Sequence, residues 1–467
     1  MNYDIHIENL GAIEEADITI TPLTILAGEN GTGKSFVTKF FYSVFNSLVK
    51  NVYTIGVSRT SVKIHNTINN LLRKESFLND EKLFLEVFKE TITETFPFSS
   101  QASFGISSYA PDEIVKQISD HLDYFKKNIL TKLETSDDLN IDKDGQHLLF
   151  SFYDFYKSIA TDTELLLYYL KNPNESYVKF LKDEVINQLK ENFQISELKH
   201  LIKFSSNYCS FSIKNILSIN ILSNNEIEID LVSFPSFANL LFFESPVYWK
   251  LLSIIPDKRL GLGFSGYIKN KDMFKETLTG VPQHFIDLKD LIFTNFKDGE
   301  RPDFIIKCAN DLEKQLKGKF KATNDDLIFE NNKGQSISKS LVSFGMTNIG
   351  IFQAVLSKNI INKGSFVFID EPESNLHPEW QAILANVLVE LAKNGVYIIV
   401  TTHSSDMLKA FDISTREQKI DEELSTYYFK SDGKLLNMTD DKFSPIEMAR
   451  RKLLETYEEL MMRGYFL

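Results

Sequence analysis

The pattern of apolar and polar positions divides the chain into two ends typical of α/β structure and a mostly helical middle. Residues 3–9 and 16–20 alternate as antiparallel strands do, and the apolar stretch 23–27 predicts a buried strand. Residues 34–50 carry apolar side chains at helical spacing. Helical patterns dominate 51–205, but no heptad repeat is sustained there, so we expect a compact helical insertion rather than a long coiled coil.

Strand patterns return in the second half of the chain. Residues 210–233 and 327–338 alternate as hairpins do. From 339 to 408 a helix, an apolar strand, a second helix and a second strand follow one another, which is the rhythm of a parallel sheet. Another hairpin is expected to turn at Asp432-Gly433, and Ser444-Pro445 begins a final helix with a capping-box spacing.

These patterns predict an α/β protein with three parts. The parts are a split head over 1–50 and 206–443, a helical insertion over 51–205, and a C-terminal helix over 444–467.

Composition excludes several classes of protein. The 467 residues include 43% hydrophobic and 25% charged side chains, as in ordinary globular proteins. No apolar run is long enough for a membrane span, and the N-terminus lacks a secretory pattern, so we expect a cytoplasmic protein. Two cysteines, Cys209 and Cys308, support neither a disulfide framework nor a four-ligand zinc site. The net charge of −13 does not indicate DNA binding by the whole surface, although a local basic groove stays open.

The segment after the first buried strand matches the phosphate-loop pattern G-x4-G-K-[ST] without deviation. It consists of Gly28-Glu29-Asn30-Gly31-Thr32-Gly33-Lys34-Ser35, between a predicted strand and a predicted helix. The glycines let successive backbone N–H groups point at one phosphate beside the positive end of the helix. We expect Lys34 to reach the β and γ phosphates of ATP and Ser35 to bind Mg²⁺.

A second motif lies where the very apolar strand 366–369 runs directly into two acids. Carboxylates at the C-terminal end of a buried parallel strand lie at the sheet edge where nucleotides bind. We expect Asp370 to hold Mg²⁺ through water and Glu371 to orient the attacking water. Together with the phosphate loop, this motif predicts a nucleotide hydrolase.

The neighbouring residues narrow the class. Ser374-Asn375-Leu376-His377-Pro378 follows the two acids, and Thr401-Thr402-His403-Ser404 ends the next strand. With these motifs the chain resembles the ABC-type ATPase superfamily, in the branch of SMC, RecF and OLD-like ATPases (AAA15 and AAA21 types). The resemblance implies an ABC-ATPase head, with a parallel-sheet phosphate-loop core and an antiparallel β lobe. It also implies that Asn375 belongs to a D-loop and that His403 is the switch histidine at the γ-phosphate.

The same resemblance implies a signature motif at the start of the helix before Asp370. The candidate is 341–345, in which Ser343 and Gly345 would approach the γ-phosphate of a nucleotide held by another subunit. Phe344 departs from the serine or glycine usual in the family, so an ordinary N-cap serine stays an alternative. Since one chain holds one phosphate loop and one signature, the resemblance implies a homodimer or a higher homo-oligomer.

The glutamine loop of the family has no clear place here. Gln101 and Gln283 are both candidates, and neither has a diagnostic neighbourhood. The stretch 244–249 is similar to a segment of AAA15- and AAA21-type ATPases, but an aromatic turn packed against the core explains it better.

Three biological roles were compared. A transporter ATPase has a much shorter interval between phosphate loop and signature than the 308 positions from Ser35 to Ser343. A RecF- or SMC-like DNA-repair ATPase stays an alternative, although the insertion lacks the heptads of a coiled coil. An ATP-gated scaffold uses the same residues and also stays open.

A fourth role is a phage-defence ATPase. OLD-type proteins carry a C-terminal TOPRIM nuclease, but only 64 residues follow His403, so the resemblance implies an effector on a separate chain. Two-gene systems fit this expectation, with a TOPRIM effector in PARIS or an HNH nuclease in Septu, and the size and insertion resemble the PARIS subunit more. The insertion or the C-terminal helix would hold the effector or sense a phage-encoded trigger, although that helix could simply be docked on the head.

Overall fold

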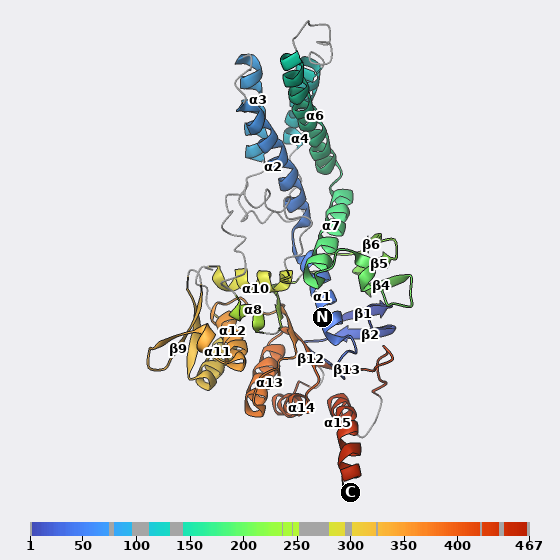
Figure 1. The fold of residues 1–467 in the computed structure, drawn as a ribbon, viewed down its shortest axis with the longest axis vertical. Helices are drawn as coiled ribbons and strands as arrows, with labels where there is room; N and C mark the ends of the chain where they lie inside the picture. Colours follow the sequence, from blue (N-terminus) through green and yellow to red (C-terminus); the bar gives the residue numbers. More distant parts are fainter. Residues whose placement is uncertain are drawn as a thin grey trace. The chain divides into compact units, whose positions relative to one another are not determined.

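The computed structural model divides into two compact units (Figure 1). The head unit contains 1–49, 185–256 and 277–467, and the helical unit contains 50–184 and 257–276. The residues that the structure describes are 2–73, 79–95, 112–130, 143–235, 237–244, 246–251, 280–294, 301–323, 326–420, 423–438 and 443–464.

The centre of the head unit is a five-stranded parallel sheet. Its strands, in spatial order, are β13 (Leu424–Phe429), β3 (Leu23–Gly28), β12 (Tyr397–Thr402), β11 (Phe366–Asp370) and β7 (Leu240–Phe243). The pairing of every neighbouring pair is parallel. All side chains of β3 and β12 are buried, as expected for strands covered on both faces.

Two antiparallel sheets complete the strands of the head. The larger one contains β2 (Glu15–Ile20), β1 (Tyr3–Glu8), β4 (Tyr208–Ile213), β5 (Leu217–Leu222) and β6 (Ile227–Leu231). The smaller one contains β10 (Ser336–Ser338), β9 (Leu327–Asn331) and β8 (Gly318–Ala322). Buried and exposed positions alternate along β1 and β4, so one face of the larger sheet packs on the core. The predicted α/β class, with a parallel core and an antiparallel lobe, is confirmed.

Helices cover the parallel sheet of the head. They are α1 (Lys34–Val49), α8 (Val247–Lys250), α10 (Gln283–Phe293), α11 (Asp303–Leu316), α12 (Phe344–Ser357), α13 (Pro378–Lys393), α14 (Ser405–Gln418) and α15 (Pro445–Gly464), with 3₁₀ turns η3 (Leu198–Leu201) and η5 (Lys339–Leu341). Apolar side chains of α10 to α15 and of the central strands form one continuous core. The predicted aromatic turn is confirmed, because Trp249 is buried and its ring lies 4.9 Å from that of Phe285.

The helical unit has a hydrophobic core of its own. Its elements are α2 (Val52–Leu72), α3 (Asn79–Thr95), α4 (Asp112–Phe125), the π-helical turn η1 (Lys126–Leu130), α6 (Lys143–Lys171) and most of α7 (Pro173–Phe193). Ile64, Phe88, Leu122 and Ile159 are buried in the core between α2, α3, α4 and α6. An independent core means that this unit can act as a separate body within the chain.

The start of the C-terminal helix is docked on the head. The Ser444 hydroxyl caps it by accepting a hydrogen bond from the Glu447 N–H at 3.2 Å and donates to the buried Asp412 at 3.3 Å. Ile446 and Ala449 are fully buried in the head core, whereas Tyr457 is 61% exposed. The helix is therefore anchored by its first turns, while its later part presents Tyr457 to solvent.

We expect Ile446→Ala to lower the free energy of unfolding of the head by about 2–5 kcal/mol, because it leaves a cavity in the core. Tyr457→Ala, on the same helix, should change it by less than about 0.5 kcal/mol. Urea denaturation followed by circular dichroism measures both. Equal effects of the two substitutions would contradict the docked arrangement.

Candidate functional site

The loop between β3 and α1 is shaped by glycines. Gly28, Gly31 and Gly33 have φ values of +152°, +79° and +94°, which side chains rarely adopt. A Cβ atom on Gly28 would lie 2.6 Å from the carbonyl oxygen of Phe429 on the neighbouring strand. The loop therefore has a backbone conformation that requires glycine at these positions, and α1 begins directly after it at Lys34.

The Lys34 side chain is folded over this loop and buried. Its Nζ donates hydrogen bonds to the carbonyl oxygens of Gly28 at 3.0 Å and Glu29 at 2.7 Å. The Thr32 hydroxyl donates to the same Glu29 oxygen at 2.9 Å. Burial lowers the pKa of Lys34, while the negative charges of Glu371 and Asp370 act against that shift. The ammonium group therefore lies in the field of the acids that end β11.

Asp370 and Ser35 meet at the C-terminal edge of the parallel sheet. The register of β11 against β12 pairs Asp370 with Thr401, whose hydroxyl donates to Asp370 Oδ1 at 2.5 Å. Burial raises the pKa of Asp370, and hydrogen bonds from Thr401 and Ser35 lower it. A buried carboxylate beside a serine hydroxyl offers the hard oxygen ligands that Mg²⁺ prefers.

Glu371 and His403 form the exposed side of the same edge. His403 Nδ1 lies 3.2 Å from Glu371 Oε1, and each side chain is a little over one third exposed. Glu371 has a left-handed φ of +48°, held by hydrogen bonds from its N–H to the Thr401 carbonyl and hydroxyl oxygens. A non-glycine residue in this region stores strain, which is frequent at functional sites.

Glu373 is a third acid that our reasoning from the sequence gave no role. It is 7% exposed, and its Oε1 accepts hydrogen bonds from the Thr402 hydroxyl at 2.7 Å and the His403 N–H at 2.9 Å. Burial raises its pKa, and these donors act in the opposite direction. Its position three residues after Asp370 was the available signal, but sequence spacing does not show which strand end a side chain will reach.

The residues expected in the signature and the D-loop lie together. Ser343 is the N-cap of α12, where its hydroxyl accepts from the Met346 N–H at 3.2 Å. A Cβ atom on Gly345 would lie 2.4 Å from the Asn375 carbonyl oxygen, so the two segments are in close backbone contact. Among the described residues, no hydrogen bond joins Ser343 or Gly345 to the phosphate loop, and Phe344 is 40% exposed. Within one chain, the start of α12 is therefore a separate, partly exposed feature.

A family profile described as the AAA ATPase domain (AAA_15) matches residues 1–408, which is most of the chain. The chain belongs to the AAA_15 family. The chain is accordingly an ATPase, as its phosphate loop predicts.

The other comparisons either match a short part of each chain or superpose the two folds only loosely. A segment of 93 residues is 31% identical to the Old nuclease of Escherichia phage P2, covering 18% of this chain and 16% of that relative. Structures similar in overall trace include the SMC head domain from Thermotoga maritima (8% identity, TM-score 0.33, 92% of this chain and 94% of that one). An ATP-binding cassette of an ABC transporter in its ADP conformation gives 10% identity and a TM-score of 0.31, over 97% and 98% of the two chains. These overlays are loose, so the family assignment rests on the profile.

The residues of this AAA_15 chain fit ATP and Mg²⁺. The glycine loop leaves its backbone open where a Cβ on Gly31 would meet no atom within 4 Å, and Lys34 supplies a cation beside it. Ser35 and Asp370 supply oxygen ligands for the metal. None of the described helices is long and apolar enough to cross a bilayer.

Of the two glutamine-loop candidates, the structure describes Gln283 alone. Gln101 lies outside the described residues, and Gln283, at the start of α10, donates to Asp287 at 2.7 Å. The residue that follows β7 at the nucleotide edge is instead Glu244, one position beyond the pairing of Phe243 with Ile369. Glu244 forms ion pairs with the fully buried His284 at 2.9 Å and with Lys39 at 3.4 Å. A largely buried acid with two basic partners therefore follows β7 at this edge.

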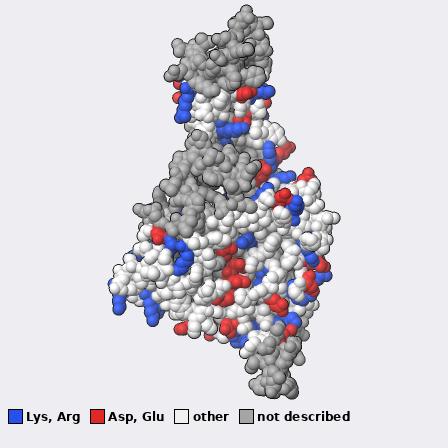
Figure 2. Space-filling model, in the orientation of Figure 1, with Lys and Arg blue, Asp and Glu red and all other residues white. Residues whose placement is uncertain are grey.

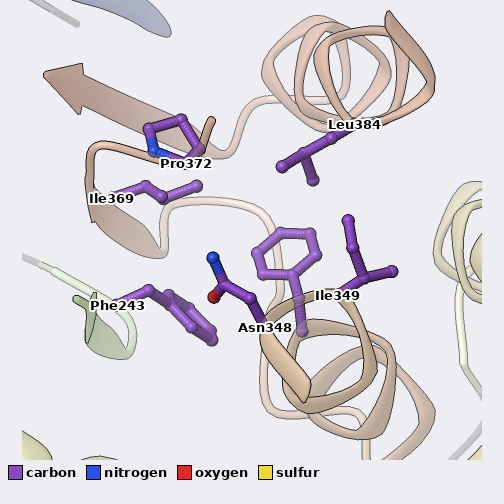
Figure 3. A pocket seen from close by; sticks show the side chains of 7 residues that line it. Phe243, Asn348, Ile349, Ile369, Pro372 and Leu384 are labelled. Atoms are coloured by element: carbon purple, nitrogen blue, oxygen red, sulfur yellow. The ribbon is translucent and has the colours of Figure 1, made fainter. Parts of the chain in front are cut away.

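A small cavity separates α12 from the end of β11. It has a volume of about 10 Å³, enough for roughly one water molecule. Figure 3 shows the Asn348 amide directed into it among apolar side chains. The lining consists of Phe243, Asn348, Ile349, Phe352, Ile369, Pro372 and Leu384. The packing between α12 and the strand of Asp370 thus leaves a small space.

The ion pair of Glu244 predicts a specific pH dependence. Burial raises the pKa of Glu244, but His284 and Lys39 outweigh it and bring the pKa to about 2, below the ordinary 4.5. The resulting stabilisation is complete above pH 4.5 and is lost as the pH falls toward 2, because the folded state then has to protonate this carboxylate. Urea unfolding over this range should show a steep loss of stability, and Glu244→Gln should make that loss measurably less steep. The matched control Glu228→Gln, on the exposed face of β6, should keep the steep loss; a parental slope in Glu244→Gln would contradict the assignment.

Proposed function

We propose that this chain is an ATP-driven switch subunit that senses infection and holds or releases a separate effector in bacterial antiviral defence. The observation that carries the ATP-driven part is the meeting of Lys34, Ser35 and Asp370 with the Glu371–His403 pair at one sheet edge. The proposal places the protein in the cytoplasm.

Each residue at this edge has a role in the proposed hydrolysis. The N–H groups of 28–35 and the Lys34 ammonium bind the phosphates of ATP. Ser35 and Asp370 hold Mg²⁺, which neutralises the charge that develops on the phosphates. Glu371 orients the attacking water and accepts its proton, and His403 contacts the terminal phosphate.

A second copy of the chain completes the site in this proposal. Ser343 and Gly345 lie at the N-terminus of α12, where unpaired backbone N–H groups favour a phosphate. Gly345 lies close to the Asn375 backbone, and among the described residues no hydrogen bond joins Ser343 or Gly345 to the phosphate loop of their own chain. We therefore assign them, with Asn375, to the nucleotide of a partner in a homodimer or a higher homo-oligomer. Binding of ATP then stabilises the assembly, and loss of the γ-phosphate releases it.

The effector is proposed to be a nuclease on another chain. The similarity to a phage-encoded protein named as a nuclease supports the link with nuclease function, although the match covers 16% of that relative. A TOPRIM nuclease, as in PARIS, is our first choice, and an HNH nuclease the second. The helical unit, with its own core, and the later part of α15 are the surfaces proposed to hold the effector or a phage-encoded trigger.

Direct action on DNA has less support. On the face drawn in Figure 2, basic side chains of the described residues are scattered and form no continuous band, and several acidic side chains gather near its middle. A net charge of −13 agrees with this picture. DNA repair therefore enters as an outcome of the test below.

We expect Glu371→Gln to bind ATP and to lower turnover by at least about 100-fold, because the amide cannot accept a proton from water. With ATP the variant should remain a closed multimer, measured by native mass spectrometry after purification with the products of its neighbouring genes. The control Glu379→Gln changes an exposed acid at the start of α13 and should keep parental turnover.

The composition of the trapped assembly decides between the roles. A multimer that contains a second polypeptide with nuclease activity supports the defence role. A bare dimer that forms with ATP and binds DNA would favour the repair role. A protein that stays monomeric both with and without ATP would contradict a site shared between two chains.

A further inference from the structure

Glu373 is the most deeply buried acid next to the proposed catalytic pair. It follows β11 by three positions, yet its side chain ends at the C-terminus of β12. One of its oxygens, Oε1, accepts from both the Thr402 hydroxyl and the His403 N–H. The main chain that carries His403 is thus tied to a single carboxylate oxygen.

One ring nitrogen of His403, Nδ1, faces two carboxylates. It is 3.2 Å from Glu371 Oε1 and 3.5 Å from Glu373 Oε1. Two acceptors on the same side favour a proton on Nδ1, and this fixes both the tautomer and the orientation of the ring. Glu373 therefore contacts His403 at both its backbone N–H and its ring Nδ1.

Burying the Glu373 side chain costs free energy that a purely structural role does not explain. Its second oxygen, Oε2, is buried and finds no hydrogen-bond donor among the described residues. A buried carboxylate with an unpaired oxygen is expensive, whereas a glutamine could supply the same Oε1 acceptor without a charge. Accepting these two hydrogen bonds does not require a charge on Glu373, so a further role is needed to explain why a carboxylate is present.

We propose that Glu373 is a positioning residue for ATP hydrolysis, which acts by fixing the imidazole of His403 beside Glu371. The inference rests on the proposed function, since it needs His403 to act on the terminal phosphate. With His403 held from two sides, Glu371 keeps its other oxygen, Oε2, which lies 3.5 Å from the Ser374 hydroxyl, for the attacking water. Glu373 itself stays buried and away from the substrate.

The test is a double-mutant cycle on the purified full chain, measuring kcat and KM for ATP. Glu373→Gln keeps an acceptor for Thr402 and the His403 N–H but removes the charge, and should lower kcat by about 10–100-fold with KM within about twofold. In a His403→Ala background the same substitution should have no further effect on kcat, because the residue through which it acts is gone. Thr402→Val removes a donor to the same oxygen and should lower kcat less, again without effect in the His403→Ala background.

The outcomes separate this inference from the proposed function. Equal losses of kcat from Glu373→Gln in both backgrounds, or no loss in either, would overturn the positioning role and leave the ATPase site intact. Parental kcat in His403→Ala would overturn both. If Glu373→Gln fails to fold, as its melting curve would show, the cycle with Thr402→Val decides by the same criterion.

Discussion

The parallel register of β3, β12, β11 and β7 is the constraint on which the rest of this molecule depends. It brings four strand ends to one edge, so that Gly28, Thr402, Asp370 and Glu244 follow one another across the sheet. Residues that are 31 positions apart in the chain are thereby held within hydrogen-bond distance, as the Thr401–Asp370 bond shows. Because the strands are buried on both faces, we expect this edge of the sheet to be rigid. A rigid edge holds charged side chains in fixed positions, as phosphate chemistry requires.

The charged groups at this edge differ in exposure. Glu371 and His403 are a little over one third exposed, whereas Lys34, Glu373 and Glu244 are largely buried and held by specific partners. Burying acids is costly, and each is offset by donors from a different element: Thr402 on β12, His284 on α10 and Lys39 on α1. The acids of this edge are therefore bonded to α1, α10 and β12 of the head.

The fold class and the phosphate loop could be predicted because short-range patterns specify them. Alternating and continuous apolar runs give the two kinds of sheet, and the glycines at 28, 31 and 33 are needed by a local backbone path. Glu244 and Glu373 could not be assigned, since their importance depends on which strands become neighbours and on partners such as His284, 40 positions away in the chain. The stretch that begins at Glu244 was interpreted from the sequence as an aromatic turn, and nothing in that pattern indicated the partners of its acid.

The central claim is that one chain supplies the phosphate loop and another supplies Ser343. Mixing two inactive proteins, Lys34→Ala and Ser343→Arg, tests it most directly. Our account predicts that each protein alone loses ATP turnover, that Ser343→Arg still binds ATP, and that an equal mixture recovers about a quarter of the parental rate, because half of the dimers then contain one intact site. Parental turnover by Ser343→Arg alone would contradict the account, since it would show that the site is complete within a single chain.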